Sequence, residues 1–182
     1  GVDMISPDIT APWHANGAIL NEVNFAPLLG GGEISRRYVE EYLFRLVDGR
    51  GRIPVEVFVG GAAAWEAAAA RWRTLLQAGM AAVLSSDVRT LGGDGQPFGL
   101  AVDGLHARVR ALTLRAEVGA LVLVVQTLEL LRTGIPLDRV DRVVVIDGDI
   151  RTAGSPARQA ADAEVAGLIA LCRAWDASGT AS

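Results

Sequence analysis

The residues best suited to chemistry lie near the start of the chain. Glu22 and Asn24 stand two apart in an apolar stretch, so both side chains leave the same face of a strand. A hairpin would bring Asp3, in the preceding apolar stretch, beside them. Carboxylate and amide oxygens are the hard ligands that Mg²⁺ prefers when it also holds nucleotide phosphates. The three residues predict a magnesium site, and the alternative is a solvated face of a hairpin.

Two short motifs around these residues carry a family resemblance. The stretch Asn21-Glu22-Val23-Asn24-Phe25-Ala26-Pro27, with Gly1-Val2-Asp3 before it, resembles the closing strands of an ATP-grasp ligase and its Glu-x-Asn-x-x-Pro signature. The resemblance implies that Asp3, Glu22 and Asn24 hold magnesium ions that bridge the phosphates of ATP.

The order of the later segments extends this resemblance. Over residues 1–147, the order of segments resembles that of the cyanophycin synthetase family. The segments are a glycine-containing loop, a helix, an Arg-Ile-Pro-Val strand entry and a Leu-Asp-Arg-Val-Asp run before an apolar strand. That family joins an ATP-grasp domain to a Mur-ligase-like domain and polymerises aspartate and arginine with ATP. The resemblance implies Mg²⁺ and ATP as cofactors of the complete parent enzyme.

The second domain departs from the family at its phosphate loop. The family's first strand runs into Gly-Thr-Asn-Gly-Lys-Thr, whereas Gly60 and Gly61 here lead into Ala64 and Trp65 at the positions of the lysine and the metal-bound hydroxyl. Val124 stands where the family has a glutamate that organises magnesium. A helix N-terminus still attracts anions, but the charge that holds a triphosphate is missing. We therefore expect no nucleotide at Gly60, Gly61 and Ala64.

The composition excludes several other chemistries. All 17 basic residues are arginine, so Schiff-base catalysis and a phosphate-loop lysine are impossible. The net charge of −4 argues against a nucleic-acid partner, which would need a basic face. No apolar run approaches the roughly 20 residues that span a bilayer. These features predict a cytoplasmic protein with neither a nucleic-acid nor a membrane partner.

Hydrophobic periodicity then predicts the elements that position these residues. We expect a hairpin from residues 2–6 and 18–25 and a helix whose apolar residues recur every four positions, ending at Gly49. Short β-branched runs then alternate with helical stretches, which is typical of parallel βαβ units. The predicted strands cover 55–59, 82–86, 118–125 and 142–146, and the predicted helices cover 62–78, 105–116 and 126–132. Ser155 and Pro156 suit the N-cap and first turn of a final helix.

The predicted fold is α/β. Residues 1–47 would form the C-terminal edge of an ATP-grasp domain, a β-hairpin and a helix, and residues 48–53 a linker. Residues 54–182 would form a degenerate, three-layer Rossmann-like (Mur-ligase-like) domain with a mostly parallel sheet. The apolar run 118–125 fits a central strand buried on both faces.

Four further segments have two interpretations each. Gly92-Gly93-Asp94-Gly95 is a turn or a glycine-rich binding loop, and Ser85-Ser86-Asp87 is a capped strand exit or a family-like site segment. His106 could pair with Asp103, although no nucleophile is placed to complete a triad. Asp147-Gly148-Asp149 is a turn or a cation site.

Two functions follow from this reading. The chain is predicted to be the C-terminal portion of a cyanophycin synthetase-like ATP-dependent carboxylate–amine ligase, inert by itself, whose partner is the remainder of an ATP-grasp domain. The alternative is a non-catalytic structural or homo-oligomerising module that has lost nucleotide binding.

Overall fold

The computed structural model describes residues 1–25, 31–46, 51–152 and 155–177, with the backbone alone for 155–158. The chain divides into two compact units, residues 1–52 and 53–182, which are described separately below as unit 1 and unit 2. The predicted helix end at Gly49 and the first half of the predicted linker, 48–50, lie outside the described residues, as does Pro27 of the signature.

Unit 1 consists of a two-stranded hairpin and a helix. Strand β1 (Val2–Ile5) pairs antiparallel with β2 (Ile19–Val23), with a register irregularity after Asp3. The Asn16 amide holds the connecting loop by donating to Ser6 Oγ at 3.0 Å and to Ala11 O at 3.3 Å. Helix α1 covers Glu33–Leu46. The predicted hairpin and helix are therefore present, with a shorter second strand than expected.

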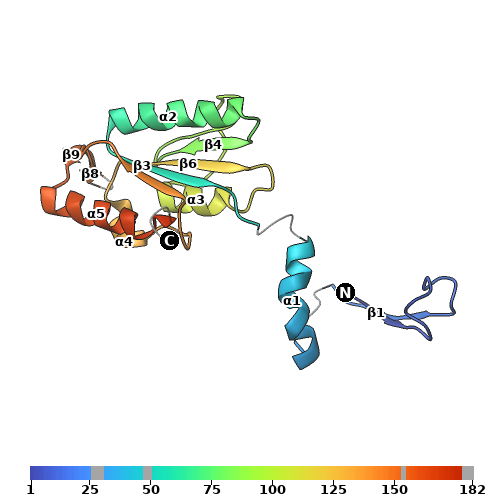
Figure 1. Ribbon diagram of the computed structural model, residues 1–182. Helices are drawn as coiled ribbons and strands as arrows, with labels where there is room; N and C mark the ends of the chain where they lie inside the picture. The colour runs from blue at the N-terminus through green and yellow to red at the C-terminus, as the bar shows by residue number, and fades with distance from the viewer. Residues whose placement is uncertain (26–30, 47–50, 153–154, 178–182) are drawn as a thin grey trace. The chain divides into compact units, whose positions relative to one another are not determined.

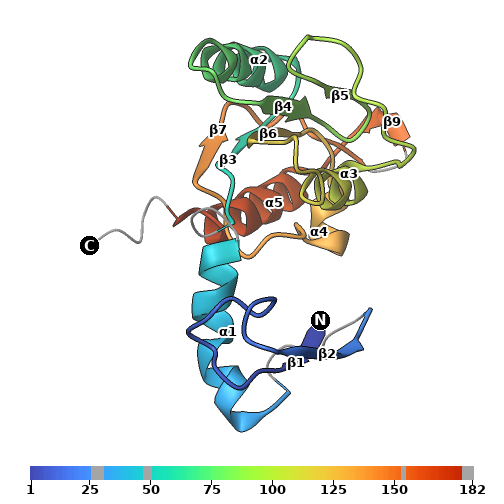
Figure 2. The same cartoon turned by 90° about the vertical axis from the view of Figure 1, so that its right-hand side faces the viewer.

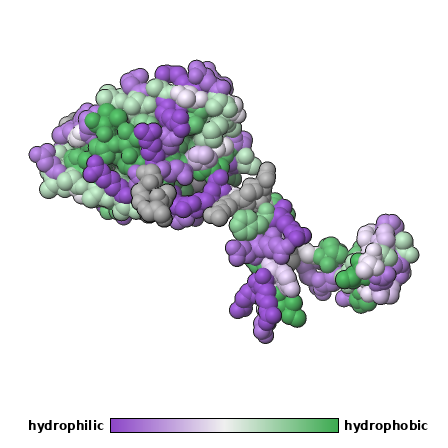
Figure 3. Space-filling model, viewed as in Figure 1, coloured by the Kyte–Doolittle hydropathy of each residue, from purple (hydrophilic) through white to green (hydrophobic). Residues whose placement is uncertain are grey.

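Unit 1 has almost no interior. Every residue of both strands is exposed, and α1 buries none of its residues. Large apolar side chains are among those exposed, for example Ile19 at 63%, Val23 at 73% and Ile34 at 76%. Apolar and polar residues are both visible on its surface (Figure 3). An isolated hairpin is marginal in water, and the apolar side chains of this hairpin and of α1 stay largely exposed.

Unit 2 is built on a five-stranded sheet in the order β5-β4-β6-β3-β7. The strands β3, β4, β6 and β7 run parallel, and β5 is antiparallel to β4. The strand bounds are β3 Val55–Val59, β4 Ala82–Ser85, β5 Thr90–Leu91, β6 Ala120–Val125 and β7 Arg142–Val145. Strand β6 is central and buried on both faces, which confirms the prediction from its continuous apolar run.

Helices cover both faces of this sheet (Figures 1 and 2). One face carries α2 alone, and the other carries α3, α4 and α5. The helix bounds are α2 Ala62–Gln77, α3 Leu105–Leu112, α4 Glu129–Thr133 and α5 Asp162–Ala174. Alternate residues of β6 enter two separate cores, Val122 and Val124 under α2 and Leu121 and Leu123 on the other face. Unit 2 is thus the expected three-layer α/β arrangement with a mostly parallel sheet.

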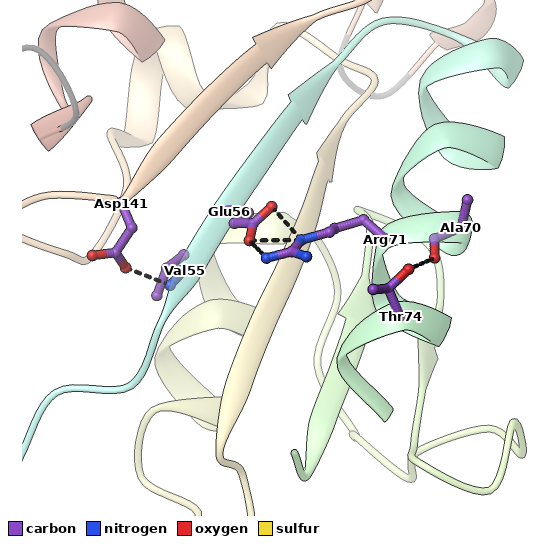
Figure 4. Close-up of polar contacts among 6 residues, drawn as sticks. All are labelled: Val55, Glu56, Ala70, Arg71, Thr74 and Asp141. Carbon is purple, nitrogen blue, oxygen red and sulfur yellow. Dashed lines mark hydrogen bonds and ion pairs between the residues drawn. The ribbon is translucent and has the colours of Figure 1, made fainter. Parts of the chain in front are cut away.

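One carboxylate is buried between the sheet and α2. Glu56 of β3 is only 7% exposed. It accepts hydrogen bonds from Arg71 of α2, from Nε at 2.8 and 3.0 Å and from Nη2 at 2.6 Å (Figure 4). The start of β3 is fixed separately, because Val55 N donates to Asp141 Oδ2 at 2.7 Å. These contacts set the position of β3, which leads into the glycine loop.

The chain crosses the carboxyl edge of the sheet after β7. Strand β8 (Arg151–Thr152) pairs antiparallel with β9 (Ser155–Gln159). Arg151 also bridges to the segment after β6, since its N donates to Gln126 O at 2.9 Å and its O accepts from Leu128 N at 3.0 Å. The segment between β7 and β8 therefore passes over the ends of the parallel strands, where open α/β sheets bind ligands.

The structure corrects the prediction for the last helix. Ser155 and Pro156 lie in β9, and α5 begins after Ala161. The start of α5 has no N-cap side chain of the expected kind, and the Glu164 carboxylate instead accepts from the N-cap amide Ala161 N at 3.1 Å. A Ser-Pro pair also suits an edge strand, because proline is tolerated there. Pairing with β8 therefore outweighs the local helix-start signal.

Two other helices are shorter than predicted. Helix α3 ends at Leu112, not at 116, and α4 starts at Glu129, not at 126. Residues 126–128 pair with Arg151 instead. Within the described parts of the chain, no helix has the length and apolar character needed to cross a membrane.

Candidate functional site

The hairpin of unit 1 brings the predicted magnesium ligands to one face. Asp3 is directly opposite Glu22 in the antiparallel register. The pairing extends one step further, because Gly1 N donates to Asn24 O at 2.7 Å and Asn24 N donates to Gly1 O at 2.7 Å. Residues opposite each other, and those two apart on one strand, share a face. Asp3, Glu22 and Asn24 therefore belong to one face of the hairpin.

The donor set on this face is two carboxylates and one amide. Among the described residues there is no cluster of three or more His, Cys, Asp or Glu side chains placed to hold a metal ion. Two carboxylates and an amide oxygen nevertheless fit Mg²⁺, which commonly takes one or two protein carboxylates and completes its octahedron with phosphates and water. This face can supply part of a magnesium site and leaves the other coordination positions to phosphate oxygens and water.

In unit 2 the loop between β3 and α2 occupies the position of a phosphate-binding loop. Gly60 N donates to Val125 O at 3.1 Å, which ties the loop to the end of β6. Gly61 N, at the start of α2, donates to the Asp147 carboxylate at 2.8 Å. The same Asp147 oxygen accepts from Asp149 N at 2.9 Å. A carboxylate of the chain therefore takes the amide that would bind a phosphate oxygen in such a loop.

Both glycines of this loop are required by the close approach of the aspartates. Gly60 has φ of 141°, and a Cβ there would lie 2.6 Å from Asp147 Oδ1. A Cβ on Gly61 would lie 2.7 Å from Asp149 Cγ. The aspartate segment after β7 thus packs directly onto the glycine loop. The Asp147-Gly148-Asp149 run is an irregular loop segment whose Asp147 carboxylate binds the N-terminus of α2.

The positions compared with the family's lysine, hydroxyl and glutamate are buried in the core. Ala64 and Val124 are completely buried, and Trp65 is 8% exposed, all between α2 and the sheet. The Arg89 guanidinium covers the Trp65 ring, 3.5 Å from its centroid. Side chains at these three positions therefore stabilise packing under α2.

The N-terminus of α3 is also bound by a carboxylate from a distant segment. Glu129 accepts from Leu105 N at 2.7 Å and from His106 N at 3.0 Å, at the start of α3. The His106 ring nitrogen Nδ1 lies 3.1 Å from Gly134 O, so this histidine joins two backbone segments and does not pair with Asp103. Carboxylates from distant segments thus neutralise the partial positive charges of both helices.

Asp87 lies beyond the end of β4, and its carboxylate has few hydrogen-bond partners. Its Oδ1 is buried and has no hydrogen-bond partner among the described atoms. Burial raises the pKa of this carboxyl above its usual range, and the nearby Arg151 guanidinium offsets part of the effect. The preceding Ser86 Oγ accepts from Arg89 N at 3.4 Å, which is the capped strand exit that one interpretation predicted.

A cavity of about 490 Å³ opens at the same edge of the sheet. It is bounded by the start of α2, the loop after β4, the end of β6 and the segment crossing to β8. The side chains that line it carry both signs of charge and one aromatic ring, and they include Trp65, Glu66, Arg89, Gln126, Asp149 and Arg151. The volume is within the range of small-molecule sites.

A cavity of similar size, about 480 Å³, lies at the other end of β4 and includes Gly92 and Asp94. There Gly92 N donates to Gln96 O and Gly95 N donates to Gly92 O, both at 2.9 Å. The glycine-rich segment is therefore a hydrogen-bonded turn between Leu91 and Pro97, as one of its two interpretations predicted.

Neither Arg89 nor Arg151 is among the functional residues predicted from the sequence. The only available signal for Arg89 was its position, since it follows a strand that ends in Ser-Ser-Asp and loops after parallel strands meet at one edge of the sheet. Arg151 carried no signal, because the crossing strand β8 was not predicted.

Comparison with known proteins adds no family to this description: no protein-family model matches the chain, and the search of curated proteins finds no match.

Proposed function

We propose that this chain is the C-terminal portion of a cyanophycin synthetase-like, ATP-dependent carboxylate–amine ligase of the cytoplasm. Unit 1 would be the closing edge of an ATP-grasp domain and unit 2 a degenerate Mur-ligase-like domain. The observation that carries the proposal is the register of the hairpin, in which Asp3 faces Glu22 and the Gly1–Asn24 pair continues the ladder.

In this proposal Asp3, Glu22 and Asn24 direct oxygen ligands toward the phosphates of bound ATP. Magnesium bound there would neutralise phosphate charge while a substrate carboxylate is converted to an acyl phosphate. Asp3 and Glu22 orient the metal with negative charge, and Asn24 adds a neutral oxygen without further charge. The rest of the nucleotide site would come from the remainder of the ATP-grasp domain.

The exposed apolar residues of unit 1 support such a partner. A stable hairpin and helix need a covered apolar face, and residues such as Val23, Ile34 and Tyr38 are 59–76% exposed within the unit. The remainder of an ATP-grasp domain would cover them. Val23, on the opposite face from Glu22, would then act through packing.

A second candidate is a non-catalytic structural or homo-oligomerising module. It is favoured by unit 2, where Asp147 fills the N-terminus of α2 and Glu129 fills that of α3. Both places would otherwise attract a phosphate. Under this candidate the hairpin carboxylates have no chemical role.

ATP-dependent ligation by the complete parent protein distinguishes the two candidates. Glu22→Gln keeps the shape of the side chain and removes one charge from the metal site, so ligation should fall by at least about a hundredfold. The matched control is Glu40→Gln on α1, which also removes one exposed carboxylate and should leave ligation unchanged. Full activity of Glu22→Gln at saturating magnesium would contradict the ligase proposal and favour the structural module.

A further inference from the structure

The cavity at the carboxyl edge of unit 2 is lined by two arginines, of which Arg151 also acts electrostatically on the buried Asp87 carboxyl. Within the described part of the chain, neither the Arg89 nor the Arg151 guanidinium makes a hydrogen bond or an ion pair within 4.0 Å. Arg89 is held by its stacking on Trp65 at 3.5 Å. Arg151 is held by the backbone bonds that join β8 to residues 126 and 128. The Arg89 guanidinium is therefore held by stacking and the Arg151 backbone by hydrogen bonds, and both guanidinium groups have N–H donors available for a ligand.

Guanidinium groups recognise oxyanions. Their planar array of N–H donors matches carboxylate and phosphate, and a stacked guanidinium keeps its in-plane donors available. Both arginines line one cavity of about 490 Å³, so an oxyanion bound in this cavity would meet two cationic side chains. This arrangement differs from a phosphate loop, where backbone amides hold the anion.

The other charges in the cavity restrict the ligand. Glu66 and Asp149 line it as well, so the four ionised side chains sum to zero. The amide at the start of α2 already binds Asp147. A triphosphate would meet two carboxylates and no free amide at Gly61, whereas a ligand with a single negative charge meets two arginines. The carboxylates and the Gln126 side-chain oxygen can accept hydrogen bonds from a donor on the ligand.

We propose that this cavity binds a small organic acid with one carboxylate, which Arg89 and Arg151 hold, and a neighbouring hydroxyl or ammonium group, which Asp149 or Glu66 accepts. The site lies in unit 2 alone and uses none of the predicted magnesium ligands. This proposal is therefore independent of whether unit 1 belongs to a ligase.

Three probes with the same carbon skeleton test this proposal. Propionate has the carboxylate alone, lactate adds a hydroxyl and alanine adds an ammonium. We expect lactate or alanine to bind the full chain in calorimetric or NMR titration with Kd below about 1 mM, at least about tenfold tighter than propionate. Lactate binding would indicate a hydroxy acid, and alanine binding an amino acid. Equal binding of all three probes, or no binding, would overturn the proposal.

Variants locate the binding. Arg89→Gln and Arg151→Gln should each weaken binding at least about tenfold. Asp149→Asn combined with Glu66→Gln should remove the advantage of lactate or alanine over propionate. Arg73→Gln is the matched control, because Arg73 is exposed on α2 away from the cavity lining. Each variant is first compared with the original chain by circular dichroism, and Arg89→Lys replaces Arg89→Gln if that variant does not fold. Unchanged affinity in both arginine variants, or tighter binding of inorganic phosphate than of lactate and alanine, would overturn the proposal.

Discussion

The ion pair between Glu56 and Arg71 offers a direct test of how unit 2 is held together. Glu56 is 7% exposed, and Arg71 makes its three hydrogen bonds. Arg71→Met keeps much of the side-chain volume and leaves Glu56 as an unpaired buried charge. Loss of one partner of a fully buried pair costs about 3–5 kcal/mol. The Arg71 side chain is 37% exposed, and water there reduces the cost, so we expect about 2 kcal/mol.

Urea denaturation followed by circular dichroism measures this loss in the free energy of unfolding. In a thermal scan the melting temperature should fall by roughly 8 °C. Arg73→Met in the same helix is the matched control and should change stability by less than about 0.5 kcal/mol. Arg71→Met combined with Glu56→Leu should recover most of the loss, because a buried apolar pair replaces the buried charge. Equal effects of the Arg71 and Arg73 changes would refute the reasoning.

Three further predictions follow from the glycine loop and the core. Gly60→Ala should destabilise unit 2 by about 1–3 kcal/mol in a thermal scan, because the backbone conformation at residue 60 is strained for alanine and the new Cβ would meet Asp147. Gly99→Ala is the control and should be nearly neutral, because a Cβ there would lie in open space. Calorimetric titration of magnesium–ATP into the chain should give no binding at residues 60–65, and micromolar binding lost on changing Gly60 would contradict this. Burial raises the pKa of the Cys172 thiol to about 11 from 9.0. Iodoacetamide should therefore label Cys172 far more slowly in the native chain than in the urea-unfolded chain at pH 8. The free energy of unfolding should fall as pH rises from 9.0 toward 11, because the thiol of the unfolded chain loses its proton first. Equally fast labelling of the native chain would contradict the burial of Cys172.

The sheet of unit 2 was predictable because its strands have an unambiguous pattern. Strand β3 has the predicted bounds, and β6 differs from the predicted 118–125 only at its start. Strands buried on both faces read as continuous apolar runs, so local sequence and tertiary environment agree. The strand order was not predictable, since it depends on which strands pair across long connections.

The failures come from segments whose structure depends on distant partners. Ser155 and Pro156 have a strong local helix-start signal, yet the chain there pairs with Arg151 as a strand. Asp147 looks like a turn residue in the sequence, and its role at Gly61 depends on a contact across 86 positions. Only the folded chain brings such residues together.

The face shared by Asp3, Glu22 and Asn24 is the centre of this account, and metal binding tests it most directly. Mn²⁺ can replace Mg²⁺ at oxygen ligands and can be titrated by electron paramagnetic resonance into the complete parent protein with ATP present. If the three residues bind the metal, Glu22→Gln should weaken Mn²⁺ binding by at least about tenfold, while Glu40→Gln should leave it unchanged. Equal Mn²⁺ affinity in the original protein and in Glu22→Gln would contradict the magnesium site and with it the ligase proposal.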